Sequence, residues 1–155
     1  MGNIFHSDFR DFIQALNNNN VKYLLVGGYA VIFYGHSRNT GDMDIWVDCT
    51  TENYKLLAKA FNEFRMPVFD MTEERFLQKD KFDVFRFGRK PVAIDIMTKM
   101  AELDFDECYK QKQVFNDDGL PLPVVHINNL ISAKKAAGRN KDLDDLQHLP
   151  PFEEL

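Results

Sequence analysis

The first third of the chain changes its hydrophobic pattern three times. Between residues 7 and 16 the apolar positions recur at helical spacing behind a serine that can cap a helix, which predicts an amphipathic helix. Residues 22–26 and 42–47 are short and largely apolar, which is typical of strands. The apolar segment 29–34 lies between these two strands and predicts a short helix.

The rest of the chain continues to mix helices and strands. The patterns predict a helix that begins at Thr50 or Thr51 and ends at Pro67, and the start of another helix at 72–74. Strands are predicted at 82–87 and 92–97, and a helix at 105–115. A strand at 122–126 follows, and then helices at 128–137 and from Asn140. Strands mixed with helices and followed by terminal helices indicate an α/β or α+β fold. At 155 residues, the chain 1–155 has the length of a single domain with a sizeable core.

Charge and composition make some kinds of binding partner, such as nucleic acids and membranes, less expected. The net charge of −5 and the pI of about 5.3 argue against a protein that coats nucleic acid, although they leave room for a local basic cleft. No apolar run approaches the ~20 residues of a membrane span, and the polar N-terminus has no signal sequence, so we expect a cytoplasmic protein without a membrane partner. The 14 phenylalanines predict an aromatic-rich core.

The first candidate for chemistry is the glycine pair Gly27-Gly28, between the strand 22–26 and the short helix. Glycines at this position let backbone N–H groups approach a ligand without interference from a Cβ atom. The start of the helix adds unpaired N–H donors and a partial positive charge. The pair therefore predicts a phosphate-binding turn.

Three aspartates form the second candidate. Asp42 and Asp44 project from the same face of the strand 42–47, because side chains alternate along a strand, and a divalent cation would resolve their repulsion. Asp95 lies among apolar residues of the strand 92–97, where an unpaired charge is costly. The bland alternative is that Asp95 lies on an exposed edge and that Asp42 only caps a turn. The ordered set, with the glycine pair upstream, favours a metal site.

This ordered set resembles the nucleotidyltransferases of the DNA polymerase β superfamily. The resemblance is closer to the small bacterial and archaeal members, including the toxin-like AbiEii type. These often read Gly-Gly-x-Ala and Arg-x-Thr-x-Asp-x-Asp, as residues 27–30 and 38–44 do here. They also commonly end in a lysine-rich helix and an Arg-x-Lys-Asp-x-x-Asp-Leu segment, which matches residues 134–146. One difference is Tyr29, where many members place a serine that touches the nucleotide phosphates.

The resemblance implies a polymerase β-like fold, a mixed β-sheet flanked by helices with further helices at the C-terminus. It implies Mg²⁺-dependent transfer of a nucleoside monophosphate from an NTP, with ATP as the expected donor, to a hydroxyl acceptor on a protein, an RNA end or a small molecule. Asp42 and Asp44 would bridge two Mg²⁺ ions ~3.5–4 Å apart, and Asp95 would complete the site of the ion that activates the attacking hydroxyl. Gly27 and Gly28 would hold the phosphates that leave as pyrophosphate.

Cations near these motifs or on the terminal helices are candidate phosphate ligands: Arg38, Lys134, Lys135, Arg139 and Lys141. Arg38 and Lys135 are the two that we assign to the nucleotide, together with the glycine pair. The alternative for the C-terminal cations is a solvated helix face that pairs with neighbouring aspartates, and this interpretation is favoured for Lys134 and Lys141.

Other functions fit parts of the same pattern. A metal-dependent glycosyltransferase also uses Asp-x-Asp, but normally needs a larger nucleotide-binding domain. A non-catalytic module that binds a nucleotide or a partner would keep the fold without the reaction. A toxin–antitoxin pair would be a biological context for the same chemistry. Because little chain is left beyond the catalytic motifs, we expect a homodimer or a helical partner protein to help form the acceptor site.

Overall fold

A six-stranded mixed β-sheet forms the centre of the molecule. The computed structural model describes residues 7–36, 40–89 and 92–150. In the order β3-β4-β2-β1-β6-β5 the strands are Val84–Arg89, Val92–Met97, Asp42–Val47, Tyr23–Val26, Leu120–Val124 and Gln113–Asp117. The pairs β2/β4 and β1/β6 are parallel, and the pairs β1/β2, β3/β4 and β5/β6 are antiparallel. This arrangement confirms the predicted mixed α+β fold.

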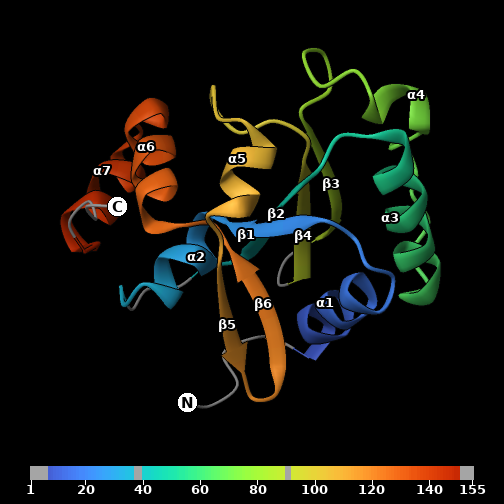
Figure 1. Ribbon diagram of the computed structural model, residues 1–155, viewed down its shortest axis with the longest axis horizontal. Helices are drawn as coiled ribbons and strands as arrows, with labels where there is room; N and C mark the ends of the chain where they lie inside the picture. The colour runs from blue at the N-terminus through green and yellow to red at the C-terminus, as the bar shows by residue number, and fades with distance from the viewer. Residues whose placement is uncertain (1–6, 37–39, 90–91, 151–155) are drawn as a thin grey trace.

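Two groups of helices pack beside the sheet, and Figure 1 shows them on opposite sides of the view. One group contains α1 (Ser7–Asn18), α3 (Thr51–Glu63) and the single turn α4 (Glu73–Phe76). The other contains α2 (Gly27–Phe33), α6 (Ile127–Ala137) and α7 (Asn140–His148), with α2 in contact with α6 and α6 with α7. The short helix α5 (Phe105–Lys110) follows β4.

The core is rich in aromatic residues, as the composition predicts. Phe12 of α1 is fully buried and packs edge to face against Phe61 and Phe64, with ring centroids 5.5 and 5.3 Å apart. Trp46 of β2 is also buried and meets Phe105 edge to face. Edge-to-face pairs of this kind add stabilisation beyond the burial of apolar area. The Phe12 contacts fix α1 against α3, and the Trp46 contact fixes the segment that begins α5 against the sheet.

Three predictions are wrong in their boundaries, and one of them is the strand predicted at 82–87, which spans Val84–Arg89. The segment 105–115 is helical only to Lys110, and residues 113–117 form β5 instead, paired with β6. Val114 is 63% exposed on this outer strand, so its apolar side chain gives no sign of a buried strand face. The strand predicted at 122–126 begins two residues earlier, at Leu120, because β5 and β6 form a hairpin.

The ends of α6 explain how the C-terminal helices turn back on themselves. His126, rather than Asn128, caps α6, because its ring nitrogen Nδ1 accepts a hydrogen bond from the Asn128 N–H. Gly138 ends the helix in the left-handed conformation, with φ of 63°, which glycine adopts without a steric penalty. The chain then starts α7 at Asn140, beside α6.

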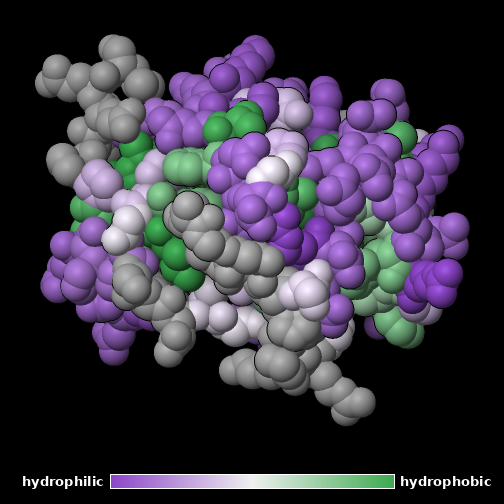
Figure 2. Space-filling model, turned by 90° about the horizontal axis from the view of Figure 1, so that it is seen from below, coloured by the Kyte–Doolittle hydropathy of each residue, from purple (hydrophilic) through white to green (hydrophobic). Residues whose placement is uncertain are grey.

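The face of the molecule shown in Figure 2 is mostly hydrophilic. On the face in Figure 2, hydrophobic side chains show only in small separate areas between hydrophilic ones. Among the described residues, no helix has the length and apolar character needed to cross a membrane.

Candidate active site

The sheet register brings the three predicted aspartates together. Asp44 of β2 lies directly opposite Asp95 of the parallel strand β4, and Asp42 lies two residues before Asp44 on the same face. The residue Asp95 is 7% exposed, which excludes the alternative of an exposed edge. Asp42 and Asp44 are half-buried. The structure therefore places three carboxyl groups on one face of two central strands.

Gly27 lies against this group. Val26, the last residue of β1, is paired with Asp44, so the chain enters α2 immediately beside the Asp44 side chain. Gly27 has a φ of +65°, and a Cβ atom added to it would lie only 2.9 Å from Asp44 Cγ. Only glycine combines this conformation with this close approach. Gly28 is buried within α2.

The electrostatics of the group favour a bound cation. Burial, followed by the charges of Asp95 and Asp42 and a hydrogen bond to Asp95, raises the pKa of Asp44 to about 7, while Lys134 opposes the shift. One carboxylate oxygen of Asp42, Oδ1, is buried and has no hydrogen-bond partner. Crowded carboxylates raise each other's pKa until a positive charge neutralises them.

Arg86 supplies part of that positive charge. It lies opposite Asp95 on the outer strand β3, donates from Nε to Asp95 Oδ1 at 2.8 Å and donates from Nη2 to Asp95 Oδ2 at 2.9 Å. Nη2 also lies 3.3 Å from Asp42 Oδ2. The hydrogen bond to Asp95 and the charges of Asp95 and Asp42 raise the pKa of Arg86. Since the Arg86 side chain is 60% exposed, it can leave the carboxylates without unfolding the sheet.

A cavity of about 240 Å³ opens beside Asp44. Gly27 and Asp44 line it on the sheet side, and α6 and the start of α7 contribute Lys134 and Arg139. Its apolar wall consists of Val26, Val84, Met97, Met100, Ala101, Leu130, Ala133 and Ala137. The cavity therefore combines carboxylates, cations and an apolar surface.

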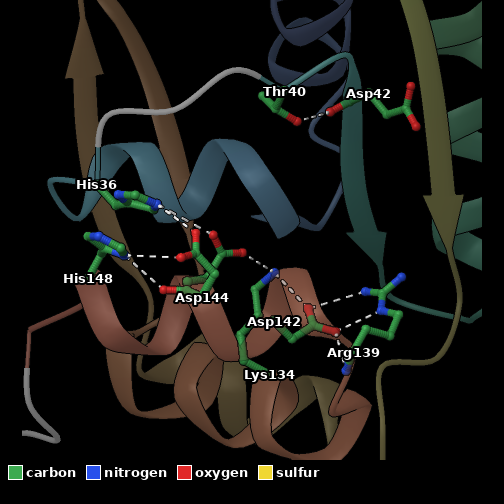
Figure 3. Close-up of polar contacts among 9 residues, drawn as sticks. His36, Thr40, Asp42, Lys134, Arg139, Asp142, Asp144 and His148 are labelled. Atoms are coloured by element: carbon green, nitrogen blue, oxygen red, sulfur yellow. Dashed lines mark hydrogen bonds and ion pairs between the residues drawn. The ribbon is translucent and has the colours of Figure 1, made fainter.

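An ion-pair network holds Lys134 and Arg139, two of the cations that line the cavity, in place (Figure 3). Lys134 is almost fully buried and lies 3.1 Å from Asp142 Oδ1 and 3.0 Å from Asp145 Oδ2. Arg139 donates from Nε to Asp142 Oδ2 at 2.7 Å. Burial alone would raise the pKa of Asp142, but the hydrogen bonds from Arg139 and Lys134 outweigh it, and the pKa is lowered. The predicted pairing of Lys134 with these aspartates is present, although it is buried rather than solvated.

The structure describes one of the two predicted cationic nucleotide ligands, Lys135, and does not place it at the cavity. Lys135 is exposed on α6 and does not line the cavity, whereas its neighbour Lys134 does. Arg38 lies outside the described residues. Tyr29 is buried and packs edge to face against Phe9, with ring centroids 5.7 Å apart, so it belongs to the core.

Sequence reasoning missed Arg86. Arg86 could have been found by counting outward from the hairpin turn, because pairing Arg89 with Val92 places it opposite Asp95. Arg139, a candidate phosphate ligand from the sequence, does line the cavity. Lys134 was assigned to a solvated face because the sequence does not show that α6 turns this face toward Asp44.

The donor set fits a hard divalent cation. Asp42, Asp44 and Asp95 offer only oxygen atoms, which Mg²⁺ prefers, and Asp42 Oδ1 is a buried acceptor without a donor. Arg86 already shows that the group holds a cation. These three residues would hold the metal that the resemblance implies.

Comparisons with known proteins support the fold. No family model and no curated protein matches the chain. TM1012 of Thermotoga maritima, a protein grouped with the nucleotidyltransferases, has a TM-score of 0.57 at 16% identity over 90% of this chain and 88% of that one. An antigenic nucleotidyltransferase-like protein of Paracoccidioides brasiliensis has a TM-score of 0.56 at 13% identity over 89% and 71%. The lincosamide antibiotic adenylyltransferase LnuA, with lincomycin bound, has a TM-score of 0.54 at 13% identity over 94% and 96%.

Proposed function

We propose that this protein, which has the fold of the polymerase β-like nucleotidyltransferases, transfers a nucleoside monophosphate from an NTP to a hydroxyl acceptor and releases pyrophosphate. The observation that carries the proposal is the meeting of Asp42, Asp44 and Asp95 on one face of the sheet, beside the glycine turn. ATP is the expected donor.

The carboxylate oxygens of the three aspartates would hold Mg²⁺, with Asp42 and Asp44 as shared ligands and Asp95 on the acceptor side. Bound there, the ions would stabilise the charge on the phosphate oxygens and lower the pKa of the attacking hydroxyl. Asp44, with its pKa of about 7, would lose its proton when the site is loaded. Arg86 would release Asp95 at the same time.

The remaining parts of the site would bind the nucleotide. The first N–H groups of α2 have no partner within the helix, so Gly27 and Gly28 can offer them to the phosphates. Lys134 and Arg139 line the same cavity and would neutralise the triphosphate. The apolar wall between β4 and α6 suits the base and the ribose. Arg38 and Lys135 stay candidates for the same role.

The proposal also covers the chemical class of the hydroxyl acceptor. The net charge of −5 favours a small molecule or a protein hydroxyl over a large RNA, since contacts to phosphate dominate RNA affinity. LnuA binds lincomycin, a small molecule, on this fold. A second subunit or a helical partner would help to form the acceptor site, and light scattering of the active form tests this. Growth arrest on expression would support the toxin–antitoxin context.

Incubation with each α-labelled NTP, Mg²⁺ and a cell extract tests the proposal. We expect one species to become labelled by the wild type and none by Asp44→Asn, with equal circular dichroism spectra for both proteins. Equal labelling by the variant would contradict the site. The non-catalytic alternative is favoured by Arg86, which neutralises Asp95 without a metal. Binding of NTP and Mg²⁺ without any labelled product would support that alternative.

A further inference from the structure

A second group of metal-ligating side chains lies outside the carboxylate site, where the end of α2 meets α7. His36 follows α2 closely, and Asp144 and His148 are one turn apart on α7. One ligand atom from each side chain lies within 4.8 Å of the others. Figure 3 shows the two imidazoles one above the other, beside the Asp144 carboxylate. We call these residues the His36–Asp144–His148 cluster.

The distances from the two imidazoles to the Asp144 carboxylate are too long for hydrogen bonds. His36 Nε2 lies 3.8 Å from Asp144 Oδ2, and His148 Nδ1 lies 3.9 Å from Asp144 Oδ1. Hydrogen bonds from nitrogen to oxygen span about 2.7–3.2 Å. Two ligands bonded to one zinc ion at ~2.0–2.2 Å lie roughly 3.4 Å apart in tetrahedral geometry. A contraction of the cluster, with a tilt of one imidazole ring, would therefore place all three ligand atoms around one ion.

His36 provides the second observation. Its side chain is only 11% exposed, and Nε2 is buried without a hydrogen-bond partner while it points toward Asp144. An unsatisfied buried nitrogen costs free energy, which a bond to a metal would recover. The two rings are stacked, with centroids 4.1 Å apart and planes at 10°. Because the lone pair of an imidazole nitrogen lies in the plane of its ring, the exposed His148 ring has to tilt out of the stack for both rings to bind one ion.

We propose that the His36–Asp144–His148 cluster binds a divalent transition-metal ion, and that the ion fastens α7 to the end of α2. Two imidazole nitrogens and a carboxylate oxygen suit Zn²⁺ and related ions, whereas Mg²⁺ prefers oxygen ligands alone. His148 Nδ1 donates a hydrogen bond to the Asp144 carbonyl oxygen at 2.9 Å. Binding of the ion replaces this exposed hydrogen bond.

The position of the cluster gives the ion a structural consequence. Asp145 lies 3.8 Å from His36 Nε2 through Oδ1 and 3.0 Å from Lys134 through Oδ2. Lys134 in turn lines the cavity beside Asp44. An ion in the cluster therefore restrains α7, whose Asp142 and Asp145 hold the Lys134 side chain of α6 in place. The proposal does not depend on the transfer reaction, because its ligands are distinct from the three aspartates of the candidate active site.

Calorimetric titration of the full chain with Zn²⁺, in an excess of Mg²⁺ that occupies the carboxylate site, tests the proposal. We expect one zinc ion per chain and at least about 10-fold weaker binding in His36→Gln and His148→Gln, since even changes behind the ligands of a metal cost that much. Asp106→Asn, an exposed helix carboxylate on α5, and Asp44→Asn are expected to keep wild-type affinity for this ion.

Thermal unfolding supplies a second measurement. Zinc should raise the melting temperature of the wild type and of Asp106→Asn, and should raise that of His148→Gln clearly less, because the ion binds only the folded state and stabilises it according to its affinity. Absence of zinc binding by the folded wild type would overturn the proposal. Zinc binding that is lost in Asp44→Asn and retained in both histidine variants would overturn it as well, since the ion would then occupy the three aspartates.

Discussion

Gly27 leaves no room for a side chain because the carboxylate of Asp44 fills the space that a Cβ atom would take. This contact joins the two halves of the candidate site, the turn that would hold phosphate and the carboxylates that would hold metal. It also explains why a glycine is needed here for two reasons at once, the close approach and the φ of +65°.

Gly27→Ala should therefore disturb Asp44 as well as the backbone. We expect Mn²⁺, used in place of Mg²⁺, to bind at least about 10-fold more weakly, as is typical when the support of a metal ligand is altered. Gly138→Ala is the matched control, because Gly138 has a φ of +63° and the nearest atom to an added Cβ is 3.8 Å away. Both variants should lose roughly 1–2 kcal/mol of stability from the backbone conformation. Equal Mn²⁺ affinity in the two variants would contradict the role of the contact.

Asp44 should make stability fall as pH rises in the absence of divalent ions. Its pKa is about 7 in the folded state and ~3.9 in the unfolded state, so the folded state holds the proton more tightly between these values. The wild type should lose up to about 4 kcal/mol relative to Asp44→Asn between pH 4 and pH 7.5, by this linkage. Urea unfolding at several pH values measures it, with the exposed Asp11→Asn as a control that keeps the wild-type slope. Parallel curves for the wild type and Asp44→Asn would refute the assignment.

Arg86 should compete with the metal for Asp95. Arg86→Gln removes the guanidinium that a metal has to displace, so we expect Mn²⁺ to bind about two- to five-fold more tightly, a modest change because the side chain is exposed. Arg75→Gln, which removes another exposed arginine with an aspartate partner, should leave the affinity unchanged. Weaker Mn²⁺ binding in Arg86→Gln would show that the arginine supports the site instead.

Two adjacent lysines on α6 should differ sharply. Lys134→Gln removes the buried cation that lies between Asp142 and Asp145 and should cost about 3 kcal/mol of stability, the low end for breaking a buried ion pair, because Asp142 keeps Arg139. Lys135→Gln changes an exposed side chain and should stay within about 0.5 kcal/mol of the wild type. Urea unfolding of both variants decides the matter, and equal losses would mean that the buried network does not depend on Lys134.

Much of this fold could be predicted from the sequence, because local signals and the global structure agree. The strand Asp42–Val47 and the strand Val92–Met97 have the predicted bounds, since each is a short apolar run between polar turns. Strand β5 could not be predicted, because Val114 is exposed on an outer strand and residues 105–115 also fit helical spacing. Pairing with β6, a contact between segments, decides its conformation.

The residues of the candidate site also differ in how far the sequence alone could identify them. Asp42, Asp44 and Gly27 are close in sequence, and an ordered motif identifies them. Arg86 reaches Asp95 only through the register of the hairpin, and Lys134 reaches Asp44 only through the packing of α6. Contacts of this kind depend on tertiary structure, which the spacing of residues along one helix or strand does not show.

The most direct test of the account is the binding of Mn²⁺ in the presence of a non-hydrolysable ATP analogue, measured for the wild type and for Asp44→Asn. The account predicts that the wild type binds Mn²⁺ and that the analogue tightens this binding, because its phosphates complete the ligands of the ion. Asp44→Asn should bind Mn²⁺ at least about 10-fold more weakly with or without the analogue. Equal affinity in the two proteins would contradict the claim that the aspartates at the glycine turn form a metal and nucleotide site.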